Sequence, residues 1–162
     1  TVQQLQGVPV GAQVAVQLGG KTDPRLGGGP LVCTATVRLH SDGHYHADGP
    51  MTGGLDKSWG PTVVLRVDDI DVLVVTQPSQ MLDLAQFTAF GIDPAACRVV
   101  GLKSMQHFRA AFEPIAGKVI VCDSGALCTP DYAKLPYPRV PRPIFPLDTD
   151  IDLARWRQDH AA

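Results

Sequence analysis

Two apolar segments separated by a pair of acidic residues constrain the fold of this chain most strongly. Residues 62–67 and 70–76 are rich in β-branched aliphatic side chains, which favour strands. The acidic pair 68–69 leaves a two-residue connection between them, which predicts a β-hairpin. This register places Arg66 opposite Asp71 as a cross-strand charge pair. Because both segments contain uninterrupted apolar runs, we expect them to be buried on both faces inside a sheet.

Further strands are predicted on the amino-terminal side of this hairpin. Residues 14–18 alternate between apolar and polar side chains up to a glycine pair, and residues 31–40 also alternate. One face of the second strand is expected to carry Leu31, Cys33, Ala35, Val37 and Leu39. Asp42-Gly43 then predicts a hairpin turn into a return strand that begins at residues 44–46.

The second half of the sequence predicts helices as well as strands. Asp83 is placed to cap a short helix with Gln86 three residues on, and Asp93 is placed to begin another. Residues 98–102 and 118–122 are predicted as strands on either side of a helix that runs from Ser104 to Glu113. Strand, helix and strand with short links predict a right-handed βαβ unit with parallel strands.

Together these elements predict an α/β fold of the mixed α+β kind. We expect a mixed sheet with amino-terminal β-hairpins, one βαβ unit near residues 97–123 and a proline-rich extended tail. Residues 1–148 are predicted to form a single domain, and residues 149–162 a tail with a short helix.

Composition excludes several classes of protein. Of the 162 residues, 44% are hydrophobic and 19% charged, which argues against disorder. Fourteen basic and sixteen acidic side chains give a net charge of -2, which argues against a dedicated nucleic-acid-binding protein. No apolar run approaches the ~20 residues that a membrane span needs.

The cysteines carry no metal-binding or redox motif. Cys33, Cys97, Cys122 and Cys128 form no C-x-x-C pair, so a zinc ribbon or a thioredoxin motif is excluded. Each cysteine lies in or beside an apolar run, and we expect buried free thiols in a reducing cytoplasm. A disulfide between Cys122 and Cys128 stays open as an alternative.

The strongest candidate binding site lies at residues 103–109. The predicted strand before it and the predicted helix after it would place free backbone N–H groups and a helix dipole at this point, which favours an anion. Lys103 adds a charge, Ser104 and His107 add hydrogen-bonding groups, and Arg109 adds a guanidinium that suits a carboxylate. The alternative is a capped helix with solvated polar residues.

Two weaker candidates accompany it. Gly20 and Lys21 follow a predicted strand, where glycine lets a backbone approach a ligand and lysine holds a negative charge; a plain turn is the alternative. His44 and His46 share one face of a strand, but two imidazoles are too few for a zinc site, and exposed strand histidines are the alternative.

Several strings, taken in order, resemble the carboxyl-terminal domain of one known family. They are Leu18-Gly19-Gly20-Lys21, Gly49-Pro50-Met51 with Gly54-Leu55, Gln80 with Asp83, Phe90-Gly91-Ile92-Asp93-Pro94, Lys103-Ser104 with His107-Phe108-Arg109, Phe112 with Pro114, and Arg142 through Asp148. In this order they resemble the microcystinase C (MlrC) metallopeptidases, named after a microcystin-degrading enzyme. The resemblance runs from about residue 11 to residue 148.

The resemblance implies a role within a longer enzyme. Family members are about three times longer than this chain, and their predicted zinc ligands lie in an amino-terminal domain that these residues do not contain. It therefore implies the carboxyl-terminal part of a zinc-dependent amide hydrolase, with no catalytic residue and no metal ligand here. Lys103, Ser104 and His107, helped by Lys21, would orient a peptide-like substrate in a cleft shared with that missing domain.

Two rival functions remain at this point. The chain is alternatively a non-catalytic anion-binding module that uses residues 103–109, or a metal-binding module that uses His44 and His46. We also expect part of the glycine-rich loop 49–60, with residues 1–10, to be exposed or buried in a homodimer contact, because the loop carries Met51, Leu55 and Trp59. The alternative is that Trp59 completes the chain's own core.

Overall fold

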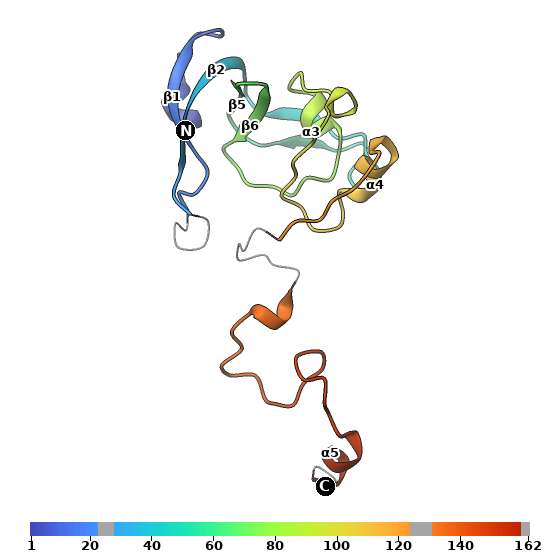
Figure 1. The fold of residues 1–162 in the computed structure, drawn as a ribbon. Helices are drawn as coiled ribbons and strands as arrows, with labels where there is room; N and C mark the ends of the chain where they lie inside the picture. Colours follow the sequence, from blue (N-terminus) through green and yellow to red (C-terminus); the bar gives the residue numbers. More distant parts are fainter. Residues whose placement is uncertain (23–27, 124–130, 160–162) are drawn as a thin grey trace. The chain divides into compact units, whose positions relative to one another are not determined.

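The computed structural model describes residues 1–22, 28–123 and 131–159. The chain divides into two compact units, Thr1–Cys122 and Asp123–Ala162, which are described separately (Figure 1). In the described residues, no helix is long and apolar enough to cross a membrane.

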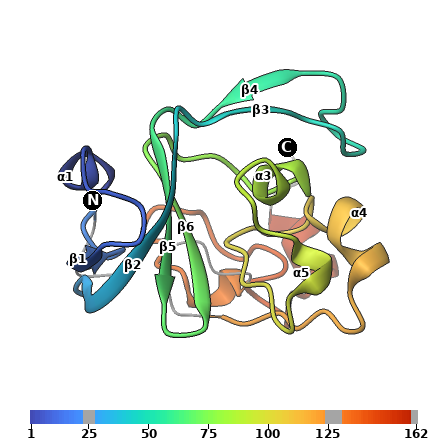
Figure 2. The same cartoon turned by 90° about the horizontal axis from the view of Figure 1, so that it is seen from above.

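The first unit is built on an antiparallel sheet. Its four strands follow the order β1-β2-β5-β6, and a separate two-stranded sheet contains β3 and β4 (Figure 2). The strands are β1 Gln13–Leu18, β2 Leu31–Ser41, β3 His44–His46, β4 Asp56–Ser58, β5 Thr62–Val67 and β6 Ile70–Val75. The short helices are α1 Val2–Leu5, α3 Ala85–Thr88, η1 Pro94–Ala96, α4 Arg109–Phe112 and η2 Glu113–Ile115. The predicted α+β class is confirmed.

The hairpin of β5 and β6 is confirmed in position and register. Arg66 pairs with Asp71 across the two strands, and the guanidinium forms two hydrogen bonds with the carboxylate, of 2.5 and 2.7 Å. The prediction that both strands lie inside the sheet holds for β5, whose first four residues are buried. It is wrong for β6, which is an edge strand, because no further described strand pairs with it.

A β-bulge in β2 divides the hydrophobic core between the two faces of the sheet. The pairing of β2 with β5 shifts between Val37 and Leu39, so that Arg38 is the extra residue. Val37 therefore packs in a first cluster with Leu65, whereas Leu39 packs in a second cluster with Val64. The prediction that Leu39 shares a face with Val37 is wrong, since one inserted residue reverses the alternation.

The turn at Asp42-Gly43 does not return the chain along β2. The segment β3 pairs with β4 instead, with Tyr45 opposite Lys57. Gly43 has a φ of +83°, and a Cβ atom there would lie 1.9 Å from the carbonyl oxygen of Gly60. The close approach of these two glycines directs β3 toward β4, so the predicted hairpin between β2 and residues 44–46 is wrong.

The βαβ unit predicted near residues 97–123 does not form in the described structure. Residues 98–102 and 118–122 are irregular, and α4 has four residues rather than the ten predicted. Several of their apolar side chains lie in solvent, with Val99 85% and Ile120 71% exposed. Runs this short need a neighbouring strand for their backbone groups, and the described part of the chain supplies none.

The cysteine prediction fails with those strands. Cys33 is half-buried, and Cys97 and Cys122 are exposed; all three are free. In the described part of the chain, the strands expected beside the last two do not form, which leaves these thiols exposed. Cys128 lies outside the described residues.

The second unit follows the proline-rich prediction. Its described residues are irregular apart from η3 Tyr132–Lys134 and α5 Leu153–Asp159, and α5 confirms the helix predicted near the end. Arg142 forms an ion pair with Asp148, whose carboxylate also accepts the N–H of Ile144 at 2.7 Å. The side-chain hydrogen bond from Arg142 lowers the pKa of Asp148, and the N–H of Ile144 lowers it further.

Candidate functional site

Three of the polar residues that carry the family resemblance meet at one place. The Gln80 amide nitrogen lies 3.4 Å from the Ser104 hydroxyl and 3.4 Å from Nδ1 of His107. The Ser104 hydroxyl donates to the carbonyl oxygen of Met81 at 3.0 Å. Because an amide N–H donates, Nδ1 of His107 accepts, which leaves the proton on Nε2. The exposed imidazole thus offers an N–H donor beside a hydroxyl group.

A buried capping network holds the segment that carries Gln80. Oε1 of Gln86 accepts the N–H groups of Leu82 and Asp83 at 2.6 and 2.9 Å, and its amide donates to the Gln80 carbonyl at 3.1 Å. The Asp83 carboxylate accepts the N–H of Ala85 at 2.9 Å, as predicted for the helix start. Gln86 and Asp83 are buried. Their reciprocal hydrogen bonds fix the backbone that carries Gln80, and so hold the cluster of Gln80, Ser104 and His107.

Asp83 also ties this segment to the glycine-rich loop. Its second carboxylate oxygen accepts the N–H of Gly49 at 2.7 Å, and a Cβ atom on Gly49 would lie 2.8 Å from the carboxylate carbon. Asp48 hydrogen bonds to the same carboxylate, and this bond raises the pKa of Asp48 above its ordinary value of 3.8. Gly49 and Asp83 are among the residues on which the resemblance rests, and their contact gives a structural reason for both.

The helix predicted to start at Ser104 begins later. Residues 105–108 form bends and turns, and α4 starts at Arg109. Ser104 is not a helix cap, because its hydroxyl is bound to Met81. Lys103 and His107 are exposed, but a four-residue helix gives them no dipole of note. The anion site is therefore reduced to side-chain donors and the charge of Lys103.

Arg109 is engaged within its own helical segment. Its Nε donates to the Gln106 side chain at 3.0 Å, Nη1 pairs with Glu113, and the guanidinium carbon lies 5.5 Å from the centre of the Phe108 ring. A guanidinium with these partners anchors α4. Binding of a substrate carboxylate by Arg109 stays a prediction.

Gly20 and Lys21 are not brought to this cluster. They follow β1, which lies on the opposite side of the first unit from α4 in both views (Figures 1 and 2). Lys21 donates to the Thr1 hydroxyl at 2.7 Å. A Cβ atom on Gly20 would lie 2.6 Å from the backbone of Gly29, so this glycine permits the two ends of a loop to approach.

The strand histidines are paired separately. His44 lies 3.2 Å from Asp42 and His46 lies 2.8 Å from Asp56, and hydrogen bonds from His44 lower the pKa of Asp42. The described residues contain no group of three or more side chains placed to hold a metal ion. The described residues therefore do not fit a zinc centre.

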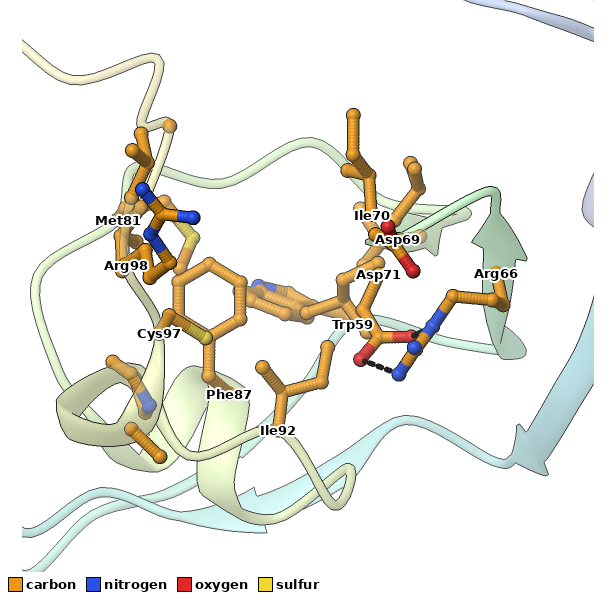
Figure 3. Close-up of a pocket in the computed structure, with 18 of the residues that line it drawn as sticks. Trp59, Arg66, Asp69, Ile70, Asp71, Met81, Phe87, Ile92, Cys97 and Arg98 are labelled. Atoms are coloured by element: carbon orange, nitrogen blue, oxygen red, sulfur yellow. Dashed lines mark hydrogen bonds and ion pairs between the residues drawn. The ribbon is translucent and has the colours of Figure 1, made fainter.

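Figure 3 shows a groove of about 930 Å³ that the sequence did not predict. It adjoins the cluster of Gln80, Ser104 and His107, because Ser79 and Met81, on either side of Gln80 in the chain, line it. One wall is the outer edge of β6, the other is residues 97–101, and the rings of Trp59 and Phe87 line it with Ile92. Ser79 and Met81 line its rim, and Met81 connects the groove to Ser104 through the hydrogen bond given above. The apolar segment 98–102, which predicts a strand, is the sequence signal for this wall of the groove.

Comparisons with known proteins agree on one relationship. The family model described as the MlrC C-terminus matches residues 1–139. Among solved structures, the crystal structure of a "Putative metallopeptidase" from Mesorhizobium sp. BNC1 is 26% identical, with a TM-score of 0.74. The alignment covers 91% of this chain but 29% of that one, so the chain spans less than a third of its neighbour's length. No curated protein matches the chain.

Proposed function

Because the chain belongs to the MlrC C-terminus family, we propose that it is the carboxyl-terminal part of a longer metallopeptidase that hydrolyses an amide bond in a peptide-like substrate. The family match over residues 1–139 carries this proposal, and the metallopeptidase name of the structural neighbour supports it. We also propose a cytoplasmic location, where the thiols of Cys97 and Cys122 would stay reduced.

In this proposal the chain supplies substrate-binding groups rather than the catalytic metal. The zinc ligands lie in the rest of the longer protein, where zinc would supply Lewis-acid chemistry. The N–H at Nε2 of His107 donates a hydrogen bond to a substrate carbonyl oxygen, and Gln80 keeps that tautomer by donating to Nδ1. Lys103 adds a positive charge that favours negative charge developing on the same oxygen.

The test is amide hydrolysis by the longer protein that contains residues 1–162. We expect a chelator to abolish hydrolysis and zinc to restore it. Lys103→Met and His107→Ala should each lower kcat/KM by about tenfold to a thousandfold, as losses of single oxyanion donors do. Lys118→Met and His44→Ala are matched controls, because both residues are exposed and lie outside the cluster.

The two halves of this proposal fail separately. Hydrolysis that survives the chelator, or no amide hydrolysis at all, would contradict the metallopeptidase assignment. Normal kinetics in the Lys103 and His107 variants would contradict the role of the cluster alone.

A further inference from the structure

We propose that the groove between β6 and residues 97–101 binds one extended polypeptide strand, supplied by the part of the longer protein that lies outside residues 1–162. This deepens the proposed function, since it names the surface through which the two parts join, and it rests on the chain being part of a longer protein.

The outer edge of β6 is ready to pair with a strand. The two-residue turn makes Val67 and Ile70 a hydrogen-bonded pair, and hydrogen-bonded pairs then alternate along the hairpin. By this alternation the N–H and C=O groups of Asp71, Leu73 and Val75 point away from β5. In the described part of the chain, no other segment pairs with that edge. An open edge of this kind is a template for strand addition.

The opposite wall also lacks a partner. Among the described residues, the backbone of residues 98–101 forms no hydrogen bond with any strand. Val99 is 85% exposed at this wall, and Ile70 is 65% exposed at the start of β6. One inserted strand would pair with the free edge of β6 and cover the exposed apolar side chains of both walls.

The lining of the groove defines the chemistry of the occupant. Leu73 and Val75 belong to the cluster that contains Trp59, so the residues that present free backbone groups also present apolar side chains to the groove. Trp59 is 3% exposed, and its indole N–H has no hydrogen-bond partner among the described residues. Figure 3 shows the Trp59 ring beside Phe87 between the two walls. These features favour an extended segment with apolar residues at every second position.

A second copy of this chain fits the groove poorly. In a second copy, residues 97–101 also lie across the groove from the outer edge of β6. If β6 of that copy entered this groove, its residues 97–101 would have to enter as well. A single strand of about six residues, roughly 20 Å long, matches β6 without that obstacle. The solved neighbour includes far more chain than the part that this unit matches, so a longer protein has polypeptide to supply.

Amide hydrogen exchange tests the proposal directly. In residues 1–162 alone, we expect the amides of Leu73 and Val75 to exchange fast and those of Val72 and Val74, which bond to β5, to exchange slowly. In the longer protein, Leu73 and Val75 should become protected by roughly a hundredfold or more, as in an internal strand. Fast exchange of both amides in the longer protein would overturn the proposal.

Two exposed positions supply matched variants. Val99→Asp places a charge in the groove and should remove most of the protection of Leu73 in the longer protein. Ile120→Asp, at a residue that is also exposed but lies outside the groove, should not. Equal protection in both variants would contradict the inserted strand. Protection that appears in residues 1–162 alone and rises with concentration would mean that a second copy is the occupant, against the proposal.

The hydrolysis assay separates this proposal from the previous one. If the β6 amides are protected but no amide bond is hydrolysed, the inserted strand is supported and the metallopeptidase assignment is contradicted. If amide bonds are hydrolysed but the β6 amides are not protected, the metallopeptidase assignment is supported and the inserted strand is contradicted.

Discussion

Replacing Asp83 by alanine is expected to destabilise the first unit more than the loss of any exposed cap. The carboxylate is 1% exposed and accepts two backbone N–H groups, from Gly49 at 2.7 Å and Ala85 at 2.9 Å. Without it, both donors lose their acceptor where water has little access. Each unsatisfied buried donor costs about 1–3 kcal/mol, so we expect the loss of both acceptors to lower the unfolding free energy by roughly 2–6 kcal/mol.

Asp48 partly offsets this loss. Its hydrogen bond with Asp83 raises the pKa of Asp48, so the neutral form of Asp48 is the one that the native structure favours. At pH 7 the removal of Asp83 also removes this unfavourable pairing. Repeating the substitution in an Asp48→Asn background removes the offset, and the difference between the two backgrounds measures the coupling of the two carboxyl groups.

The assay is urea unfolding followed by intrinsic fluorescence, because Trp59 is buried against Tyr45 and Phe90. Asp93→Ala is the matched control: its carboxylate accepts the N–H of Ala95 at 2.9 Å, but it is an exposed cap and should cost about 0.5–1 kcal/mol. If Asp83→Ala costs no more than Asp93→Ala, the burial argument is refuted.

Two further predictions concern a glycine and a pH dependence. Gly43→Ala should lower the free energy of unfolding in urea by roughly 3 kcal/mol or more, because the new Cβ would overlap the Gly60 carbonyl oxygen. Gly54 has a similar φ of +84° but lies in open space, so Gly54→Ala should lower it by about 1–2 kcal/mol. Equal losses in the two variants would contradict the clash. The pKa of Asp48 is higher in the folded chain than its value of 3.8 in the unfolded chain. The stability that its bond with Asp83 contributes is therefore fully present below pH 3.8 and is lost as the pH rises through the folded-state pKa. Asp48→Asn should therefore unfold at a higher urea concentration than the original chain at pH 7, and this difference in midpoint should vanish near pH 3. A difference that does not depend on pH would show that the carboxyl pair is not its source.

Local patterns with a local physical cause were predictable from the sequence. The β5–β6 hairpin follows from its two-residue connection and its charge pair, and both the register and the ion pair are present. The side-chain contacts just before α3, which starts at Ala85, follow from the reciprocal reach of Asp83 and Gln86. In each case the partners lie within a few residues, so the sequence contains all of the information.

Features that depend on distant contacts were not predictable. The bulge at Arg38 leaves no mark in the alternating pattern of β2, and it alone decides which face Leu39 joins. The turn at Gly43 pairs β3 with β4 because Gly43 packs against Gly60, which is distant in sequence. Of the predicted site, the structure joins Ser104 and His107 through Gln80, which the resemblance named but no spacing argument selected as a site residue.

The proposed strand site and the proposed substrate site share one segment of backbone. Met81 lines the groove with its side chain, while its carbonyl oxygen holds the Ser104 hydroxyl at 3.0 Å. The Gln86 side-chain amide holds the same segment by donating to the Gln80 carbonyl oxygen. A strand seated in the groove would therefore press on the residue that positions Ser104, and Ser104 and His107 share Gln80 as a partner. A substrate bound at Ser104 and His107 and a strand bound in the groove would therefore both depend on the backbone of residues 80–81.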